Sequence, residues 1–370
     1  MTNPAAPMQR TSRDPETLRR QLESWLGHVL GPDSAPTVDD LSSTDANGMS
    51  SDTVLFHATW TDGEGLDRDE HLVARIAPHD DDVPVFPAYD MAGQFETLRL
   101  VRALTDVPVP TPLWCETDPR HVGAQFFVMS RVEGVVPPDV LPYPFGGNWL
   151  YDAAPVEQMR LQDSTVAAIA ALHDIPDAVA RFAFLERPDD GDTHLRRHVA
   201  HTRAWYDMVR SAGAVSPLVE RGFAWLDAHW PADEGPTVLS WGDARIGNVI
   251  YRDFVPAALL DWEMAGLGPR ELDIAWLVCG HLVFQHLSVM VELPGMPDFL
   301  RAVDVVEQYR RLTGHEIRDL DFYLTYAALQ WGIVFLRTGQ RQAHFGEREL
   351  PADPEELIFH RDLLAHLLAT

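Results

Sequence analysis

The pattern of apolar residues changes near residue 131, and this change constrains the fold more than any other feature of the chain. Before it, "TVLFHATW" (53–60) and "HLVARIA" (71–77) are rich in β-branched and aromatic residues, and the turn "TDGEG" between them predicts a hairpin. "AQFFVMSRVEG" (124–134) predicts a further apolar strand. After residue 131 helical spacing dominates, over 155–175, around 195–229 and in three stretches between about 300 and 369.

Two helices are expected within the β-rich part. "DPETLRRQLESWLGHVLG" (14–31) starts with Asp14 as N-cap and Pro15 in the first turn, and its apolar residues recur at helical spacing. "AGQFETLRLVRAL" (92–104) shows the same spacing. The chain therefore predicts an α+β, two-lobed fold with a cleft between the lobes. Its expected parts are a flexible tail (1–13), a small β-rich N-lobe (14–131) and a large helical C-lobe (132–370).

Charge and composition limit the partners of the chain. The formal net charge is −27, which disfavours nucleic acid and anionic membranes; it suits a cationic small ligand, or simply solubility. No apolar run reaches the length of a membrane span, and the N-terminal "MTNPAAPMQRTSRDPETLRR" lacks the apolar core of a secretory signal. Cys115 and Cys279 are expected to be reduced thiols. We therefore expect a cytoplasmic protein, monomeric or homodimeric, with no membrane or nucleic-acid partner.

The stretch "VLSWGDARIGNVIY" (238–251) places charged and amide side chains in a short loop between two apolar runs. Asn248 follows Asp243 by five residues, and Asp261 ends the next apolar run in "AALLDWEMAGLGPRELDIAW" (257–276). Protein kinases use the same order of aspartate, asparagine and aspartate for catalysis. Phosphoryl transfer suits these residues, because Mg²⁺ prefers hard oxygen ligands and an acceptor hydroxyl needs a base. Aspartate, glycine and asparagine also form turns, so the full string rather than the spacing alone carries this prediction.

The two strings resemble the catalytic core of the aminoglycoside phosphotransferase and choline kinase-like superfamily. Within it they resemble the kinase-like domains associated with acyl-CoA dehydrogenases and the proteins described as "putative aminoglycoside phosphotransferases" of actinobacteria. The resemblance extends through "VPVPTPLW", "FFVMSRVEG" and "IAALHDI" and covers about residues 35–280. It implies a protein kinase-like fold and a Mg²⁺- and ATP-dependent phosphotransferase, with GTP as the other donor to consider.

Carried over to this sequence, the resemblance assigns roles in the catalytic loop. Asp243 would be the catalytic aspartate, and Arg245 would lie near the transferred phosphate. Asn248 and Asp261 would be the Mg²⁺ ligands. Asp273 would brace the loop by accepting its backbone N–H groups, although an aspartate there could also be an ordinary helix cap.

The resemblance also implies a nucleotide site in the N-lobe. Arg75 would hold the α- and β-phosphates, and Glu96 would pair with it; either residue could instead be an ordinary surface charge. The loop 42–51 would cover the phosphates, and the strand end at 128–130 would meet the base through its backbone. The residues assigned to these two segments are Ser50, Ser51, Val128, Met129 and Ser130.

Two positions depart from the pattern of the family. Trp241 stands where the family usually has a histidine, so it must fill that space and find another partner for its indole N–H. Arg75 stands in place of a lysine, and its planar guanidinium is no neutral replacement. His173, Trp262 and Trp276 are expected to be core residues.

The segment between Asp261 and the following helix is about ten residues long, which leaves no room for a peptide-binding platform. A small molecule with a hydroxyl group is therefore the expected acceptor. "HLVFQHLSVMVELPGMPDFL" (281–300) is apolar; it predicts either an acceptor site for a hydroxylated lipid-like or acyl-thioester molecule, or a core helix. The alternative function is a nucleotide-binding pseudokinase or scaffold, motivated by Trp241 and Arg75.

Overall fold

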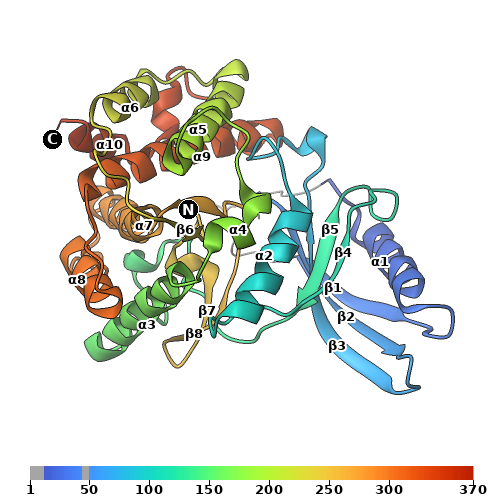
Figure 1. Ribbon diagram of the computed structural model, residues 1–370. Helices are drawn as coiled ribbons and strands as arrows, with labels where there is room; N and C mark the ends of the chain where they lie inside the picture. Colours follow the sequence, from blue (N-terminus) through green and yellow to red (C-terminus); the bar gives the residue numbers. More distant parts are fainter. Residues whose placement is uncertain (1–11, 44–49, 370) are drawn as a thin grey trace.

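The computed structural model describes residues 12–43 and 50–369, which form two lobes (Figure 1). The N-lobe is a five-stranded antiparallel sheet in the order β1-β2-β3-β5-β4, and a helix covers each face. Its elements are α1 (Pro15–Leu30), β1 (Thr37–Ser43), β2 (Asp52–Thr61), β3 (Asp67–Ile76), α2 (Met91–Leu104), β4 (Pro112–Glu116) and β5 (Phe126–Ser130).

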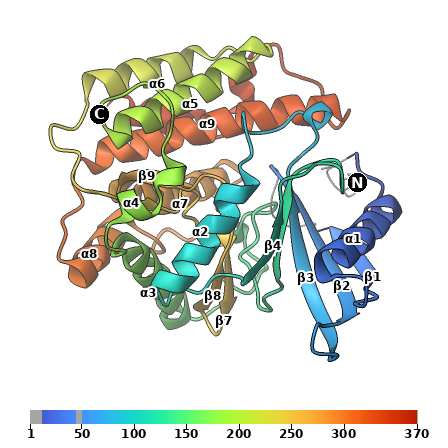
Figure 2. The same ribbon diagram turned by 45° about the vertical axis from the view of Figure 1, so that its right-hand side comes forward.

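Two apolar cores explain why the sheet carries a helix on each face. Leu22 and Trp25 of α1 pack against Phe56 and Ala74, which point to the outer face of the sheet. Phe127 of β5 points to the other face and belongs to the main core, which also contains residues of α2 and of the C-lobe. Helix α2 therefore lies between the sheet and the C-lobe (Figure 2).

The C-lobe is mainly helical. β6 pairs with β9 and β7 with β8, so the loop 241–248 connects two small antiparallel sheets. The elements are α3 (Pro155–His173), α4 (Ala178–Arg181), α5 (His194–Ser211), α6 (Pro217–Ala228), β6 (Thr237–Ser240), β7 (Val249–Arg252), β8 (Val255–Leu259), β9 (Gly266–Pro269), α7 (Glu271–Met290), α8 (Ala302–Thr313), α9 (Leu320–His344) and α10 (Arg361–Leu367). Short 3₁₀ turns cover Asp80–Asp82, Tyr143–Phe145, Ala183–Leu185, Ile246–Asn248 and Pro354–Leu357.

Helix α7 is the one helix within residues 12–43 and 50–369 that is long and apolar enough, by composition, to cross a membrane. Most of it is buried inside the C-lobe, where it packs against α9. Its composition is therefore that of a core helix.

The α+β prediction is confirmed, but three strands were not expected from the sequence. β1 ("TVDDLSS") and β4 ("PLWCE") are the two edges of the large sheet. An edge strand has neighbours on one side only, so it tolerates charged residues and proline and lacks a clear apolar alternation. β9 ("GLGP") contains two glycines and a proline, which ordinarily indicate a turn.

The predicted flexible tail (1–13) falls mostly outside the described residues, and its last residue is anchored. Arg13 pairs with Asp52 (Nε–Oδ2 2.9 Å) and donates to the carbonyls of Ala77 and Val122. These contacts tie the start of α1 to the sheet. The prediction that the tail extends through Arg13 is therefore wrong at its end.

The connection between the lobes is held against the small β7–β8 sheet. Val135 and Tyr251 exchange two backbone hydrogen bonds, at 3.0 and 2.8 Å. Gly134 has φ +153°, and a Cβ there would overlap the side chain of Ile250 and the carbonyl of Tyr251. A glycine is required because the chain must approach the strand this closely.

Candidate active site

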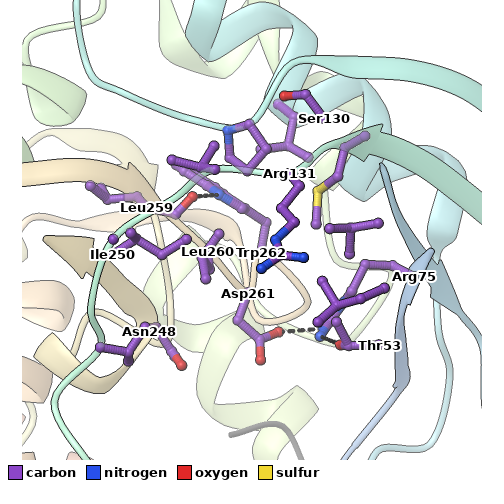
Figure 3. A pocket seen from close by; sticks show the side chains of 18 of the residues that line it. Thr53, Arg75, Ser130, Arg131, Asn248, Ile250, Leu259, Leu260, Asp261 and Trp262 are labelled. Atoms are coloured by element: carbon purple, nitrogen blue, oxygen red, sulfur yellow. Dashed lines mark hydrogen bonds and ion pairs between the residues drawn. The ribbon is translucent and has the colours of Figure 1, made fainter. Parts of the chain in front are cut away.

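Two cavities meet at Asp261. The hinge cavity, with a volume of about 270 Å³, lies between the lobes; Asn248, Arg75 and Asp261 form its polar end, and Met129 and Leu259 are among its apolar walls (Figure 3). The aromatic cavity, of about 160 Å³, lies on the other side of Asp261. Its lining residues include Phe86, Asp139, Asp243, Arg245, Asp261, Glu263, Trp276, Phe284, Trp331, Val334 and Phe335.

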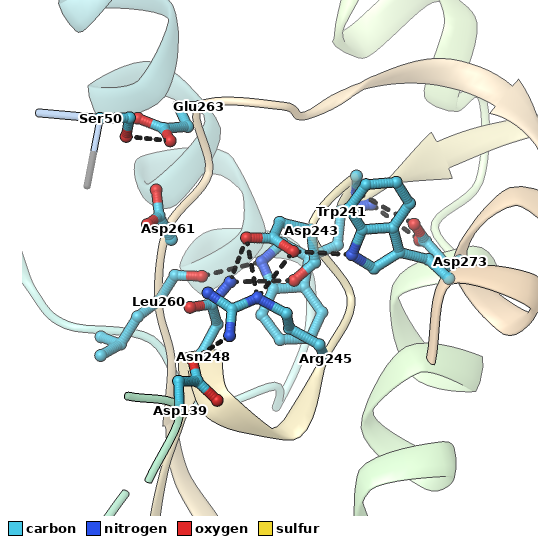
Figure 4. Close-up of polar contacts among 12 residues, drawn as sticks. Ser50, Asp139, Trp241, Asp243, Arg245, Asn248, Leu260, Asp261, Glu263 and Asp273 are labelled. Carbon is cyan, nitrogen blue, oxygen red and sulfur yellow. Dashed lines mark hydrogen bonds and ion pairs between the residues drawn. The ribbon is translucent and has the colours of Figure 1, made fainter. Parts of the chain in front are cut away.

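Asp243 lies at the centre of a polar cluster in the loop between β6 and β7 (Figure 4). Asn248 Nδ2 donates to Asp243 Oδ2 at 2.6 Å, and Arg245 Nε donates to Oδ1 at 3.0 Å. Trp276 of α7 also donates to Oδ1, at 2.6 Å. The carboxylate is thus held at a fixed orientation on the wall of the aromatic cavity. Because Asn248 uses its nitrogen for Asp243, its Oδ1 is the atom left to face a cation.

Asp273, on the first turn of α7, holds the backbone of this loop. Its buried carboxylate accepts from Trp241 N (2.7 Å), Gly242 N (2.9 Å) and the Ser240 hydroxyl (2.7 Å). His173 also contacts it, with Nε2 3.0 Å from Oδ2. The structure thus has the bracing geometry expected for Asp273, and it places His173 in the core beneath the loop.

Trp241 is fully buried, and its indole N–H finds a partner. It donates to the carbonyl of Leu260 at 2.9 Å, and the ring packs against Trp262 with centroids 6.0 Å apart. Leu260 N in turn donates to Asn248 O at 2.8 Å. The tryptophan therefore connects the catalytic loop to the residue that precedes Asp261.

Replacing Trp241 with phenylalanine should lower the free energy of unfolding by about 1–3 kcal/mol, because the Leu260 carbonyl would stay buried without a partner. Metal-dependent nucleotide binding should weaken with it, since Leu260 positions Asp261. Urea denaturation and titration calorimetry would measure the two effects. The same substitution at the half-buried Trp60, at the end of β2, is the control, and equal effects at both sites would contradict the role given to Trp241.

Arg75 is buried, and its charge faces the C-lobe. Nη1 donates to Thr53 Oγ1 at 2.7 Å, and Nη2 donates to Asp261 Oδ1 at 2.8 Å and lies 3.5 Å from Glu263 Oε2. The expected pairing with Glu96 is wrong for this structure. Glu96 points along the surface of α2 and forms a two-point ion pair with Arg99 at 2.6 and 2.7 Å, which lowers the pKa of Glu96.

The helix register explains the missing pair. Gln94 and Leu98 are the residues of α2 that line the hinge cavity, and Glu96 lies two residues from each of them. Residues two apart on a helix face different directions, so Glu96 cannot share the side of Gln94. Arg75 instead takes its carboxylate partners from the segment after β8.

The loop expected to cover the phosphates is described only in part, because residues 44–49 lie outside the described residues. Ser50 and Ser51 are both buried. The Ser50 hydroxyl contacts Glu263 Oε1 and lines the aromatic cavity, whereas Ser51 Oγ has no hydrogen-bond partner among the described residues.

The segment expected to meet the base reaches the wall of the hinge cavity, and part of its backbone is already hydrogen-bonded within the fold. Val128 is paired with strands on both sides and its side chain belongs to the outer core of the N-lobe. The N–H groups of Ser130 and Arg131 are already donated, to Thr111 O and His71 O. Met129 and Ser130 do line the hinge cavity, together with residues 131–134 and Val136. The N–H groups of Ser130 and Arg131 are therefore not available to a ligand, while the cavity wall continues through residues 131–134.

Three polar residues of the site were missed from the sequence: Asp139, Glu263 and Trp276. Asp139 forms an ion pair with Arg245 Nη1, and the missing side chain of Gly247 makes room for this pair. Burial opposes the charge on Arg245, but the carboxylates of Asp139 and Asp243 raise its pKa.

Trp276 was expected in the core, and it is buried there while donating to Asp243. The string "DWE" places Glu263 two residues after Asp261, and this spacing was a signal for Glu263. Nothing in the sequence indicated Asp139.

Glu263 is a buried carboxyl group of the site with a raised pKa. Burial and the neighbouring Asp261 carboxylate raise its pKa to about 8, against the opposing effects of Arg75 and Ser50. Burial also raises the pKa of Asp261, although Arg75 opposes it. Glu263 Oε2 is buried and has no hydrogen-bond donor among the described residues. The closeness of Asp261 and Glu263 therefore disfavours two full negative charges in this part of the site.

The apolar wall of the aromatic cavity comes largely from segments that the sequence did not indicate. Phe284 is the residue of 281–300 that lines it, and the rest of the wall comes from α9 and from the loop after β3. That loop is held on the C-lobe, because Arg337 donates to Pro84 O (2.7 Å) and Trp205 donates to Val85 O (2.8 Å). The residues that these two segments supply are Val85, Phe86, Trp331, Val334, Phe335 and Thr338.

A lobed fold with these side chains at the junction of two cavities defines a phosphotransferase-like protein. Residues 43–289 match the family model of the phosphotransferase enzyme family, so the chain belongs to this family. Among curated relatives, it is 24% identical over 312 residues to acyl-CoA dehydrogenase family member 10 of Mus musculus, and 29% identical over 171 residues to family member 11 of Gallus gallus. These alignments cover 83% and 46% of this chain but 26% and 20% of the relatives. The chain thus spans about a fifth to a quarter of the length of these relatives.

Solved structures of low sequence identity share the fold. A "putative aminoglycoside phosphotransferase" of Ralstonia eutropha aligns with a TM-score of 0.64 at 18% identity, over 94% of this chain and 96% of that chain. A type I macrolide 2'-phosphotransferase aligns with a TM-score of 0.56 at 16% identity, over 98% of both chains. Aminoglycoside phosphotransferase APH(4)-Ia, in a ternary complex with ADP and hygromycin B, aligns with a TM-score of 0.53 at 15% identity, over 95% of this chain and 99% of that chain. These alignments confirm the kinase-like fold expected from the sequence.

Proposed function

We propose that the chain transfers the terminal phosphoryl group of ATP, or of GTP, to a hydroxyl group of a small and largely apolar molecule. The observation that carries the proposal is that Asp261 lines both cavities, beside Asn248 in one and Asp243 in the other. A phosphoryl group held at this junction has a donor site on one side and an acceptor site on the other.

The hinge cavity suits a nucleotide. Its apolar walls would enclose a planar base beside the backbone of residues 131–134, and its polar end would receive the phosphates at Arg75. Arg75 is already charged and fixed by Thr53 and Asp261, so it can pair with phosphate oxygens without ordering a flexible side chain. The structural neighbour in complex with ADP supports nucleotide binding by this fold.

The donor set also suits Mg²⁺. Asn248 Oδ1 and the Asp261 carboxylate are hard oxygen ligands, and Glu263, whose Oε2 lies 3.5 Å from Arg75 Nη2, adds a second carboxyl group nearby. When bound, the ion would neutralise the charge on the nucleotide phosphates. Asn248 and Asp261 would hold it, and Glu263 would lie next to it.

On the acceptor side, each residue has a distinct task. Asp243 is held by Trp276, Asn248 and Arg245 so that its carboxylate can orient an acceptor hydroxyl and take its proton. Arg245 is fixed between Asp243 and Asp139, with Nη2 left to face the moving phosphoryl group. The reaction breaks the bond between the terminal phosphorus and the bridging oxygen of the nucleotide and forms a bond to the acceptor oxygen.

The wall of the aromatic cavity determines which acceptor is preferred. A polycationic acceptor would need an oxygen partner for each ammonium group, but much of the cavity wall is apolar and includes Phe86, Trp331, Val334 and Phe335. The carboxylates near the catalytic loop already face Arg75 and Arg245. An apolar hydroxylated metabolite, such as a hydroxylated acyl chain or acyl thioester, fits better than an aminoglycoside. The acyl-CoA dehydrogenase names of the curated relatives agree with this preference.

The alternative is a nucleotide-binding scaffold without transfer activity. Trp241 and Arg75 motivated it, but both residues have partners that leave Asp243, Asn248 and Asp261 in place. A scaffold has no need for these three side chains together. We therefore favour the enzyme.

A phosphorylation screen with the purified protein tests the proposal. ATP or GTP with Mg²⁺ would be offered with hydroxylated fatty acids and hydroxyacyl-CoAs, aminoglycosides, choline-like alcohols and sugars, and phosphorylated products would be detected by mass spectrometry. We expect transfer to the apolar hydroxylated compounds. Preference for an aminoglycoside would contradict the acceptor assignment, and nucleotide binding without any transfer would support the scaffold.

A further inference from the structure

A small third cavity lies beyond the aromatic cavity. Its volume is about 10 Å³, close to the room that one water molecule needs. Arg245 and Phe284 line both this cavity and the aromatic cavity, so these two side chains form the partition between them. The remaining lining residues are Tyr143, Ile246, Gly247, Leu277, Gly280, His281 and Leu300.

The two side chains that form the partition differ in how readily they can be substituted. Arg245 is held by ion pairs with Asp243 and Asp139 and belongs to the catalytic loop. Phe284 is apolar and buried, and its ring lies 5.7 Å from Tyr143 on one side and 5.7 Å from Trp331 on the other. The depth of the aromatic cavity is therefore set by the size of the side chain at position 284.

The third cavity offers an apolar surface to anything that enters it. Tyr143 and His281, which also line it, are hydrogen-bonded to each other, with the Tyr143 hydroxyl 2.8 Å from His281 Nδ1. His281 Nε2 lies 3.1 Å from Met296 O. Leu277 and Leu300 contribute hydrocarbon surface, and Gly280, one turn before Phe284, adds no side chain. Hydrocarbon is favoured here over a polar group, because Tyr143 and His281 bind each other and Arg245 is held by Asp139 and Asp243.

We propose that Phe284 limits the length of the acceptor, and that the part of the acceptor approaching it is an unbranched apolar tail. This inference rests on the proposed function, since it takes the aromatic cavity as the acceptor site. A smaller residue at 284 should open the third cavity to the tail. Acceptors longer than the native limit should then bind without altering Asp243, Arg245 or the nucleotide site.

The test compares the wild type with Phe284→Leu and Phe284→Ala on straight-chain primary alcohols of increasing length. In the wild type, kcat/KM should rise by about fourfold for each methylene that becomes buried, up to a limiting length. Both variants should move that limit to longer chains. Phe299→Leu is the matched control, because Phe299 is a buried phenylalanine that packs on Tyr143 and His281 but lines neither cavity.

A binding measurement separates this inference from the proposed function. Straight-chain alkyl methyl ethers carry no hydroxyl group, so calorimetry with them reports the length of the cavity without any transfer. If the variants bind longer ethers but no form of the protein phosphorylates any alcohol, the role of Phe284 is supported and the proposed function is contradicted. An unchanged length limit in both variants would overturn the inference. If Phe284→Ala does not fold, Phe284→Leu decides the question alone.

Discussion

An Asp243→Asn variant is expected to lose about 10²–10⁴-fold in kcat for phosphoryl transfer while binding nucleotide with nearly unchanged affinity. The amide cannot take the proton of the acceptor hydroxyl, although its oxygen can still accept from Trp276. Asp243 lines the aromatic cavity and not the hinge cavity, so the nucleotide site should be spared. Steady-state kinetics and calorimetry with ATP and Mg²⁺ would measure the two quantities.

Asp227→Asn is the control for this substitution. Asp227 is an exposed aspartate on α6, so the variant loses the same charge away from both cavities. Its turnover should match that of the wild type. If Asp243→Asn turned over as fast as the wild type, Asp243 would not be the catalytic base; if it lost nucleotide binding as well, the change would be a structural one.

An Asp261→Asn variant should lose most of its dependence on Mg²⁺. The amide removes one carboxylate ligand, and the loss of metal affinity should exceed the roughly 10–100-fold that changes in outer-shell partners cause. Asparagine suits the test because Asp261 has φ +59°, a backbone conformation that asparagine tolerates and alanine does not. Nucleotide binding measured without Mg²⁺ should change little. Equal binding with and without Mg²⁺ in the wild type would instead favour the scaffold.

The chain offers a closely matched control for that variant. Asp253 lies eight residues earlier, also has positive φ (+49°), and is exposed in the turn between β7 and β8. Asp253→Asn therefore makes the same chemical change in a similar backbone conformation. It should leave Mg²⁺ dependence and the free energy of unfolding unchanged.

The residues of the catalytic loop were predictable because their positions depend on local chain geometry. Asp243 and Asn248 are joined by a hydrogen bond across five residues, and β7 and β8 form a tight hairpin that returns the chain to Asp261. Spacing along the sequence therefore fixes distances in space at this site. The same holds for α1, whose N-cap Asp14 and apolar stripe are visible in the sequence.

The partners that come from distant segments were not predictable in the same way. Glu96 was expected at Arg75, but the register of α2 turns it toward Arg99, and Asp261 takes its place from 186 residues away. Asp139 reaches Arg245 across 106 residues and left no pattern in the sequence. Such contacts depend on how the lobes pack, and packing is not encoded in the spacing of neighbouring residues.

The sequence by itself determined the two-lobed α+β fold, the close placement of Asp243 and Asn248, and the family to which they point. Only the tertiary structure decided the shape and polarity of the aromatic cavity. Its wall joins the loop after β3, one face of α7 and one face of α9, which are far apart in the chain. Each segment is apolar like any core segment, and the cavity exists only because packing leaves their side chains facing the same space beside Asp243.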